Sequence, residues 1–216
     1  MSTENKIVVW DVETTRLIER GGTSIERMEI SVACALIFDF GDMKLEARDI
    51  MDRAERRVFW HEEVYPKRGE CLDRLADLLS ECKLHVAFNG IKFDMLVMKQ
   101  HFMTPEAYKA ACQRLYDPYE DLVKSIGSFS LASLLLTNGI QCKLGKGIDA
   151  PDLWDDKEYD ELEEYCAADV DRLGKLVLQP SIRIPGYMMR LPMGTLAMLL
   201  DNMAVKDPPQ VAVEAT

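Results

Sequence analysis

The chain of 216 residues lacks the long apolar run that a membrane-spanning helix needs. None of its hydrophobic stretches approaches the roughly 20 residues that cross a bilayer. Its first residues, Met-Ser-Thr-Glu-Asn-Lys, also lack the basic and then apolar order of a secretory signal. Internal repeats and low-complexity blocks are missing as well. We therefore expect a soluble, cytoplasmic protein that has no membrane partner.

Cysteine and histidine are too few and too scattered for a zinc site or a disulfide framework. The six cysteines include no Cys-x-x-Cys pair, and the chain has three histidines. Structural zinc sites need closely spaced pairs of such ligands, and disulfide-rich proteins are typically short and secreted. We expect the cysteines to be reduced and to lie in the core.

Basic residues are scarce relative to acidic ones. The chain has 26 Lys and Arg against 37 Asp and Glu, which gives a net charge of −11. Proteins that hold long nucleic acids are usually basic, so this balance argues against broad, non-specific duplex binding. It still allows a narrow site for a few nucleotides in which divalent cations neutralise the phosphates.

The composition is that of a globular protein with a C-terminal extension. Hydrophobic residues make up 48% of the chain, which is enough for a sizeable core. We predict one domain at residues 1–180, an appendage at 181–206 and a disordered tail at 207–216. Residues 188–203 hold five of the twelve methionines. Because methionine suits adaptable apolar contacts, this stretch is expected either to cap the core or to form a homo-oligomer interface.

Hydrophobic periodicity predicts both strands and helices along the chain. The predicted strands cover residues 6–12, 30–40, 58–60 and 84–88, with 44–49 as a weaker candidate. The predicted helices cover residues 71–82, 93–102, a segment beginning at 104, 131–136 and 158–178. Residues 18–29 and 138–154 are predicted loops. Neighbouring strands without a helix between them imply antiparallel pairing, so we predict an α/β fold with a mixed sheet flanked by helices.

Two acids end the first predicted strand. Alternate strand residues share a face, so Val9, Asp11 and Glu13 point the same way. Two carboxylates held close together at a buried strand end repel each other and favour a bound cation. The alternative is an acidic strand end that lies in water.

Two further acids lie where the pattern favours apolar residues. Asp94 begins the helix that follows the strand at 84–88, where it could also serve as a helix N-terminal charge. Asp169 lies one turn after Tyr165 on the longest helix, so both side chains share a face. A structural Tyr–Asp hydrogen bond or a solvated helix edge is the alternative there. Four carboxylates from three elements are suited to hard divalent ions, which take oxygen ligands.

Three motifs in this order resemble the DEDD superfamily of 3′–5′ exonucleases, which have a ribonuclease H-like fold. The tyrosine subclass is indicated because Tyr165 precedes Asp169 by four residues, whereas the histidine subclass would need His in place of Glu164. The similarity extends to the proofreading domains of family B DNA polymerases and covers roughly residues 6–178. The motifs are Asp11-Val12-Glu13-Thr14-Thr15, His85 to Asp94, Tyr116-Asp117 with Ser128 to Leu131, and Tyr165-Cys166-Ala167-Ala168-Asp169.

The resemblance implies a role for each matching carboxylate. It implies two divalent cations, Mg²⁺ or Mn²⁺, with Asp11, Glu13 and Asp169 as ligands of the first. Asp11 would bridge to the second cation and Asp94 would support that cation through water. Tyr165 would orient the attacking water, a role that suits a phenol with an ordinary pKa near ~10 better than full base catalysis.

The resemblance also implies contacts to the 3′ end of a single-stranded DNA or RNA substrate. Thr14 and the backbone that follows it would meet the terminal 3′ hydroxyl, which makes Thr15 a substrate-binding residue as well. Leu17 and Phe93 would pack on the last base or ribose, and Asn89 would form a hydrogen bond nearby. A Leu or a Phe at such a position is equally suited to the core. One departure is Arg16, where many relatives have Gly. Backbone phosphates are expected to meet basic residues among Lys92, Lys99, Lys143, Lys146, Arg183 and Arg190.

Two functions follow from this reading. The first is a two-metal 3′–5′ exonuclease that releases nucleoside 5′-monophosphates. The alternative is a weakly active binding or scaffold module that retains the fold. The presence of all four acids and the tyrosine favours the enzyme. No motif distinguishes DNA from RNA, because that distinction depends on contacts to the 2′ hydroxyl.

Overall fold

The computed structural model describes residues 3–17, 24–120, 129–142, 150–179, 181–185 and 190–192. In this part of the chain, six strands form one sheet in the order β4-β3-β2-β1-β5-β6, and two more form a small separate sheet. The strands of the large sheet are β1 (Lys6–Thr14), β2 (Ile30–Asp39), β3 (Glu55–Trp60), β4 (Glu70–Cys71), β5 (Leu84–Val86) and β6 (Leu115–Tyr116).

The large sheet is mixed, as predicted. β1 pairs with β2 and β2 with β3 in antiparallel register, whereas β5 is parallel to both β1 and β6. The antiparallel half comes from strands that follow one another in sequence, and the parallel pairs of β5 with β1 and β6 need the helical connections before and after β5. The predicted α/β class and the ribonuclease H-like arrangement are confirmed.

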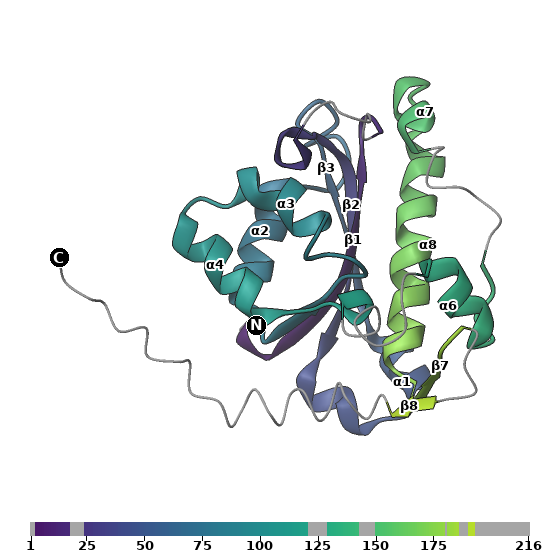
Figure 1. Cartoon of the computed structure of the whole chain (residues 1–216). Coiled ribbons are helices and arrows are strands. Elements are labelled where there is room, and N and C mark those ends of the chain that lie inside the picture. Colours follow the sequence, from purple (N-terminus) through teal and green to yellow (C-terminus); the bar gives the residue numbers. More distant parts are fainter. Residues whose placement is uncertain are drawn as a thin grey trace, which may run out of the picture.

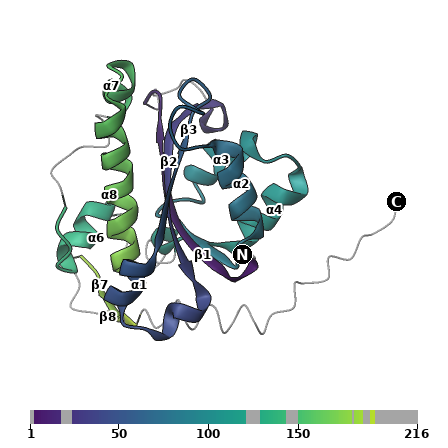
Figure 2. The same cartoon turned by 180° about the vertical axis from the view of Figure 1, so that it is seen from behind.

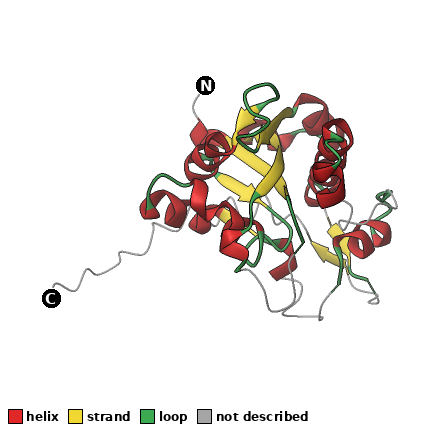
Figure 3. Cartoon of the chain, turned by 90° about the horizontal axis from the view of Figure 1, so that it is seen from above, coloured by secondary structure: helices red, strands yellow, loops and turns green. Residues whose placement is uncertain are grey.

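Helices cover both faces of the sheet (Figures 1 and 2). Seen from above, they flank the strands on either side (Figure 3). One face carries α2 (Leu72–Glu81), α3 (Asp94–Met98) and α4 (Pro105–Arg114). The other carries α1 (Ala47–Arg53), α6 (Leu131–Thr137), α7 (Ala150–Asp155) and α8 (Tyr159–Val177).

Strand alternation divides the core into two layers. Val8 and Trp10 of β1 pack with the α2 side, whereas Ile7 and Val9 pack with the α8 side, and all four side chains are fully buried. The faces alternate along the strand, so Asp11 continues the α8 side. Asp11 and Glu13 therefore follow the apolar half of β1, which is buried in the core on both faces of the sheet.

Most predicted elements are confirmed, and the differences are short segments. Residues 47–53, which overlap the weaker strand candidate, form α1 instead, and this helix buries only Ile50 and Met51. Residues 150–155 form α7, which overlaps the end of the loop predicted at 138–154. Two buried residues in a single pair of turns give too little periodicity to identify a helix from sequence.

The appendage predicted at 181–206 is described only in part. β7 (Ser181–Arg183) pairs with β8 (Arg190–Pro192), and Ile182 is buried in the core on the α8 side. The side chain of Asn138, just after α6, accepts from the Arg183 N–H at 2.6 Å and donates to the Arg183 carbonyl at 2.8 Å. Most of residues 188–203 and the tail at 207–216 lie outside the described residues, so the homo-oligomer interface and the domain boundaries stay predictions.

The cysteines are free thiols, as expected, but they do not all lie in the core. Cys34, Cys82 and Cys166 are buried, whereas Cys112 is exposed on α4. The core placement predicted for Cys112 is therefore wrong. Across the described residues, no helix has both the length and the apolar character needed to cross a lipid bilayer.

Candidate active site

Asp11 and Glu13 lie where β1 extends beyond its parallel neighbour. β5 pairs with β1 only from Ile7 to Val9, after which the chain turns away toward α3. The other edge of β1 stays paired with β2 through Glu13, so the strand remains fixed. Pairing with β2 therefore holds both carboxylates in place, while β5 no longer pairs with the other edge of β1 at these positions. Each of the two residues is half-buried.

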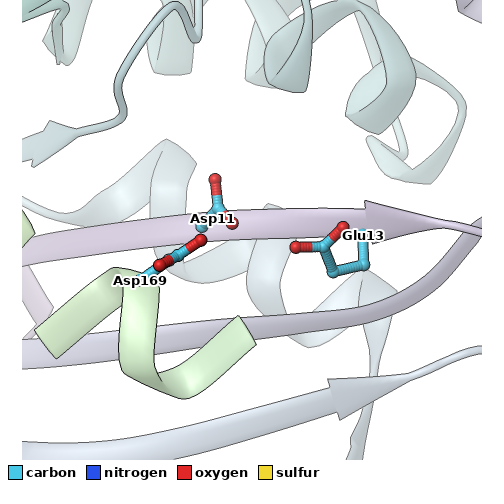
Figure 4. Close-up of side chains that lie close together, drawn as sticks. All are labelled: Asp11, Glu13 and Asp169. Atoms are coloured by element: carbon cyan, nitrogen blue, oxygen red, sulfur yellow. The ribbon is translucent and has the colours of Figure 1, made fainter. Parts of the chain in front are cut away.

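Asp169 joins them from α8. Cys166, Val170 and Leu173 form the buried stripe of this helix, and Asp169 lies at the edge of the stripe. The Cys166 thiol donates to the backbone carbonyl of Asp11 at 3.6 Å, which ties the helix to the strand. One carboxylate oxygen from each of Asp11, Glu13 and Asp169 lies within 4.8 Å of the other two (Figure 4). We call these three residues the carboxylate cluster.

Asp94 is the first residue of α3 and lies close enough to affect the cluster. The residue is 3% exposed, and its Oδ1 atom has no hydrogen-bond partner among the residues that the structure describes. Burial raises its pKa to about 7, although the backbone N–H groups of Asp94 and Val12 oppose this rise. A buried carboxylate oxygen without a donor is costly, and a bound cation or its water would satisfy it.

Burial raises the pKa of each acid in the cluster, and the charges of neighbouring acids add to this rise at Asp11 and Glu13. Burial, together with the charges of Asp94, Glu13 and Asp169, raises the pKa of Asp11 well above its ordinary value. Burial and the charges of Asp169 and Asp94 raise the pKa of Glu13 to about 8. Burial also raises the pKa of Asp169, which Arg172 partly offsets. Without a cation the group therefore retains protons near neutral pH, and a cation that binds must displace them.

The residues fit a divalent metal site in their chemistry. All the potential ligands are carboxylate oxygens, which Mg²⁺ and Mn²⁺ prefer, and no other group of three acid, His or Cys side chains in the described ranges is close enough to hold an ion. The structure brings together Asp11, Glu13 and Asp169 as predicted, and the charge of Asp94 acts on both strand acids.

Asp117 fixes the loop between β5 and α3. This residue follows β6 directly and is 4% exposed. Its Oδ1 accepts from the Asn89 N–H at 2.9 Å, and its Oδ2 accepts from the Ile91 N–H at 3.1 Å. Asn89 adopts a φ of 63°, a left-handed conformation that Asn tolerates well. Asp117 was noted only within the resemblance, and the Asp117-Pro118 pair, which is typical of a turn, was the signal available in the sequence.

Three predicted substrate contacts follow Glu13 at the end of β1. Thr14 is nearly buried and donates to the Arg16 carbonyl at 2.9 Å. The Thr15 hydroxyl is buried and finds no hydrogen-bond partner in the described part of the chain. Leu17 is 50% exposed, as a residue that packs on a substrate base would need to be. The Arg16 side chain points to Glu29, at 3.9 Å, on the surface.

The remaining predicted residues lie on the β5–α3 loop and on α8. Asn89 is half-buried, and its backbone N–H is held by Asp117. Phe93 immediately precedes Asp94 and packs partly against the core on the α2 side. Tyr165 is half-buried on α8, one turn before Asp169. Contact of these side chains with a substrate stays a prediction.

His85 packs in the core, as expected. The Trp10 indole N–H donates to its Nδ1 at 3.0 Å, and its Nε2 lies 2.8 Å from the carbonyl oxygen of Ala111. Burial lowers its pKa to about 4, so the ring is neutral at physiological pH. The nitrogen bonded to Ala111 therefore carries the proton, because a carbonyl can only accept.

Sequence analysis missed Arg172 among the basic residues. Its Nη1 lies 2.6 Å from Oδ1 of Asp169, three residues earlier on α8. The i, i+3 spacing of an acid and a base on a helix was the available signal. Two of the basic residues that were named instead form surface ion pairs, Lys92 with Glu120 and Lys99 with Glu26. Lys143 and Lys146 lie outside the described residues.

Comparisons with known proteins show the fold. No protein-family model matches the chain, and no curated protein matches it in sequence. The chain is similar to a family B DNA polymerase from the archaeon Pyrobaculum calidifontis, with a TM-score of 0.53 and 16% identity over 78% of this chain and 24% of the polymerase. At this identity the similarity concerns the fold alone, and it agrees with the ribonuclease H-like arrangement.

Weaker similarity extends to exonuclease I. One structure of exonuclease I gives a TM-score of 0.48 at 15% identity over 81% of this chain and 41% of that protein. The Escherichia coli enzyme in complex with a 5cy-dT13 oligonucleotide gives 0.45 at 14% identity, over 96% of this chain and 46% of that one. The chain thus spans about a quarter of the polymerase's length and less than half of exonuclease I.

Proposed function

We propose that this chain is a metal-dependent 3′–5′ exonuclease that removes nucleoside 5′-monophosphates from single-stranded DNA or RNA. The observation that carries the proposal is the carboxylate cluster, with oxygens of Asp11, Glu13 and Asp169 within 4.8 Å of one another. Core packing on both sides of β1 holds these like charges together. Buried Asp94, with its unpartnered Oδ1, adds a fourth acid whose charge acts on the cluster.

Each acid has a role that its position supports. Asp11, Glu13 and Asp169 would hold one divalent cation, and Asp11 and Asp94 would hold a second. Two such cations, when bound, supply an activated water and neutralise the charge of the reacting phosphodiester. Tyr165 lies one turn before Asp169 on α8, where a phenol would orient that water without changing its own ionisation.

The substrate class follows from charge and from the shape of the strand end. A chain with a net charge of −11 favours a short grip on a strand end over binding along a duplex. Leu17 is exposed four residues after Glu13, and Phe93 directly precedes Asp94, whose charge acts on the cluster. These residues would receive the terminal nucleotide, with Thr14, Thr15 and Asn89 around its sugar.

The test is degradation of matched single-stranded DNA and RNA oligonucleotides that carry a label at the 5′ end. With Mg²⁺ or Mn²⁺ we expect a ladder that shortens from the unlabelled end, and no cleavage in EDTA. Asp11→Asn is the inactive control, because it removes a charge from the cluster without changing the size of the side chain. If the native protein binds Mn²⁺ but cleaves neither oligonucleotide, the exonuclease proposal is wrong and a binding module is favoured.

A further inference from the structure

A cavity adjoins the carboxylate cluster along α8. Its volume is about 540 Å³, and it lies between one side of α8 and the segment that follows α6. These two helices lie side by side in both side views (Figures 1 and 2). The lining residues are Gly139, Ile140, Gln141, Cys142, Ala168, Asp171, Arg172 and Lys175.

Arg172 connects the cavity with the cluster. It lines the cavity, and its Nη1 atom contacts Oδ1 of Asp169 at 2.6 Å. Its side chain is only 14% exposed and that of Asp169 is 26% exposed, so water screens this ion pair weakly. Within the described ranges, Arg172 is the one basic side chain that forms an ion pair with any of Asp11, Glu13, Asp94 or Asp169.

The ion pair between Arg172 and Asp169 is most favourable when the cluster holds no cation. Without a metal, the guanidinium partly neutralises three acids held within 4.8 Å of one another. Once a divalent cation binds Asp169, the carboxylate is neutralised from the other side, and the guanidinium then faces a like charge. Its side chain already lines the cavity, so a small rotation would take the guanidinium away from the cation.

The charged side chains that line the cavity favour a bound anion, although the chain as a whole is acidic. Lys175 lines it from the next turn of α8, is exposed, and forms no ion pair with the described acids. Among the described residues that line the cavity, Asp171 is the one acid, and Arg56 of β3 pairs with it at 3.2 Å. A phosphate in the cavity would therefore meet Lys175 and a released Arg172, with the opposing carboxylate already paired.

We propose that Arg172 couples metal loading to phosphate binding. Arg172 neutralises Asp169 while the cluster is empty, and it turns into the cavity to hold a backbone phosphate of the substrate once a cation occupies the cluster. This inference rests on the proposed nuclease function, and it adds a phosphate subsite at Arg172 and Lys175. Arg172 would compete with the metal for Asp169 before the cation binds and would bind the nucleic acid afterwards.

The test uses two equilibrium measurements that should move in opposite directions. Mn²⁺ affinity is measured by calorimetry on the protein alone. Affinity for a fluorescein-labelled dT10 is measured by anisotropy with Ca²⁺ in place of Mn²⁺. Because the competitor is gone, Arg172→Gln should tighten Mn²⁺ binding by about fivefold, the worth of a modest ion pair. The same variant should weaken dT10 binding by about fivefold or more, since a phosphate contact is lost.

Two control variants separate the proposed coupling from simple loss of charge. Lys175→Gln should weaken dT10 binding while Mn²⁺ affinity stays unchanged, because Lys175 does not contact Asp169. Arg74→Gln removes the same charge from the exposed face of α2, across the sheet, and should change neither affinity. Arg172→Met keeps the apolar stem of the side chain and serves as a second variant, in which both shifts should recur.

Other results would overturn the inference. Weaker Mn²⁺ binding in both Arg172 variants would show that Arg172 orients Asp169 for the metal instead of competing with it. Unchanged dT10 binding would remove the phosphate subsite. Oligonucleotide cleavage by the native protein tests the nuclease function separately, so a nuclease whose Arg172 variants show no opposite shifts retains the function and loses only this inference.

Discussion

Replacement of Asp94 by Asn should stabilise the metal-free protein at alkaline pH. The folded-state pKa of Asp94 lies near 7, above its ordinary value of 3.8, because the side chain is buried. A carboxyl whose pKa is raised on folding favours the native state while it is protonated. Its contribution is therefore complete below about pH 4 and is lost as the pH rises through about 7. Asn carries no charge, so the Asp94→Asn variant does not lose this stability as the pH rises.

The magnitude follows from the same two values. The rise from 3.8 to about 7 corresponds to about 4 kcal/mol of lost stability once Asp94 is fully ionised. The Asn amide is also buried at a position where Oδ1 has no donor among the described residues. The cost of this burial offsets about half of the stability that Asp94→Asn recovers. We expect a net stabilisation of about 2 kcal/mol at pH 8, or a rise in Tm of about 4–8 °C for a chain of this size.

The assay is thermal unfolding in EDTA at pH 4.5 and at pH 8. At pH 4.5 the native protein has lost only about 1 kcal/mol through Asp94, less than the cost of the buried amide, so the variant should be slightly less stable than the native protein. At pH 8 the variant should be more stable. Asp77→Asn, on the exposed side of α2, is the charge-matched control and should behave like the native protein at both values. If Asp94→Asn is only as stable as the native protein at pH 8, or less stable, then the burial of ionised Asp94 does not destabilise the fold and the reasoning is refuted.

Three further predictions concern catalysis and the core. Asp11→Asn and Asp169→Asn should each reduce oligonucleotide cleavage to background while circular dichroism stays native, because each removes a charge from the cluster; cleavage at near-native rates would contradict the metal assignment. Tyr165→Phe should lower kcat much more than it raises KM, whereas equal losses would indicate a purely structural tyrosine. His85→Ala should destabilise the fold by about 3 kcal/mol in chemical denaturation, because it leaves the Trp10 N–H and a carbonyl of α4 unpaired in the core. The activity of the folded fraction of His85→Ala should remain native.

Sequence alone predicted the elements with clear periodicity. The buried stripe of α8 and the alternation along β1 extend over several turns or residues, so the facing of Asp11, Glu13 and Asp169 could be inferred from spacing. Their convergence could not be derived from periodicity, because it depends on how α8 packs across the sheet. The family resemblance supplied that step, and the 4.8 Å group agrees with it.

Features that depend on tertiary contacts were missed for physical reasons. Asp117 looks like an ordinary turn residue until β6 places it beneath the loop that carries Asn89. Arg172 looks like a solvated helix residue because its acidic partner was assigned to a metal alone. In both cases the contact is to a residue, Asn89 or Asp169, that had already been assigned another role. Sequence spacing does not show which of several possible partners a side chain contacts.

The same close packing of acids destabilises the metal-free fold and gives the cluster its affinity for cations. The packing that brings Asp11, Glu13 and Asp169 together raises their pKa values, so at low pH protons occupy the place of the cation. A divalent ion must displace those protons, and its binding becomes stronger as the pH rises and fewer remain. Stabilisation of the fold by Mn²⁺ should therefore grow between pH 5 and pH 8, the interval over which the metal-free protein itself becomes less stable. A site that only oriented neutral side chains would show neither trend, so these opposing pH dependences link the geometry of the cluster directly to metal binding.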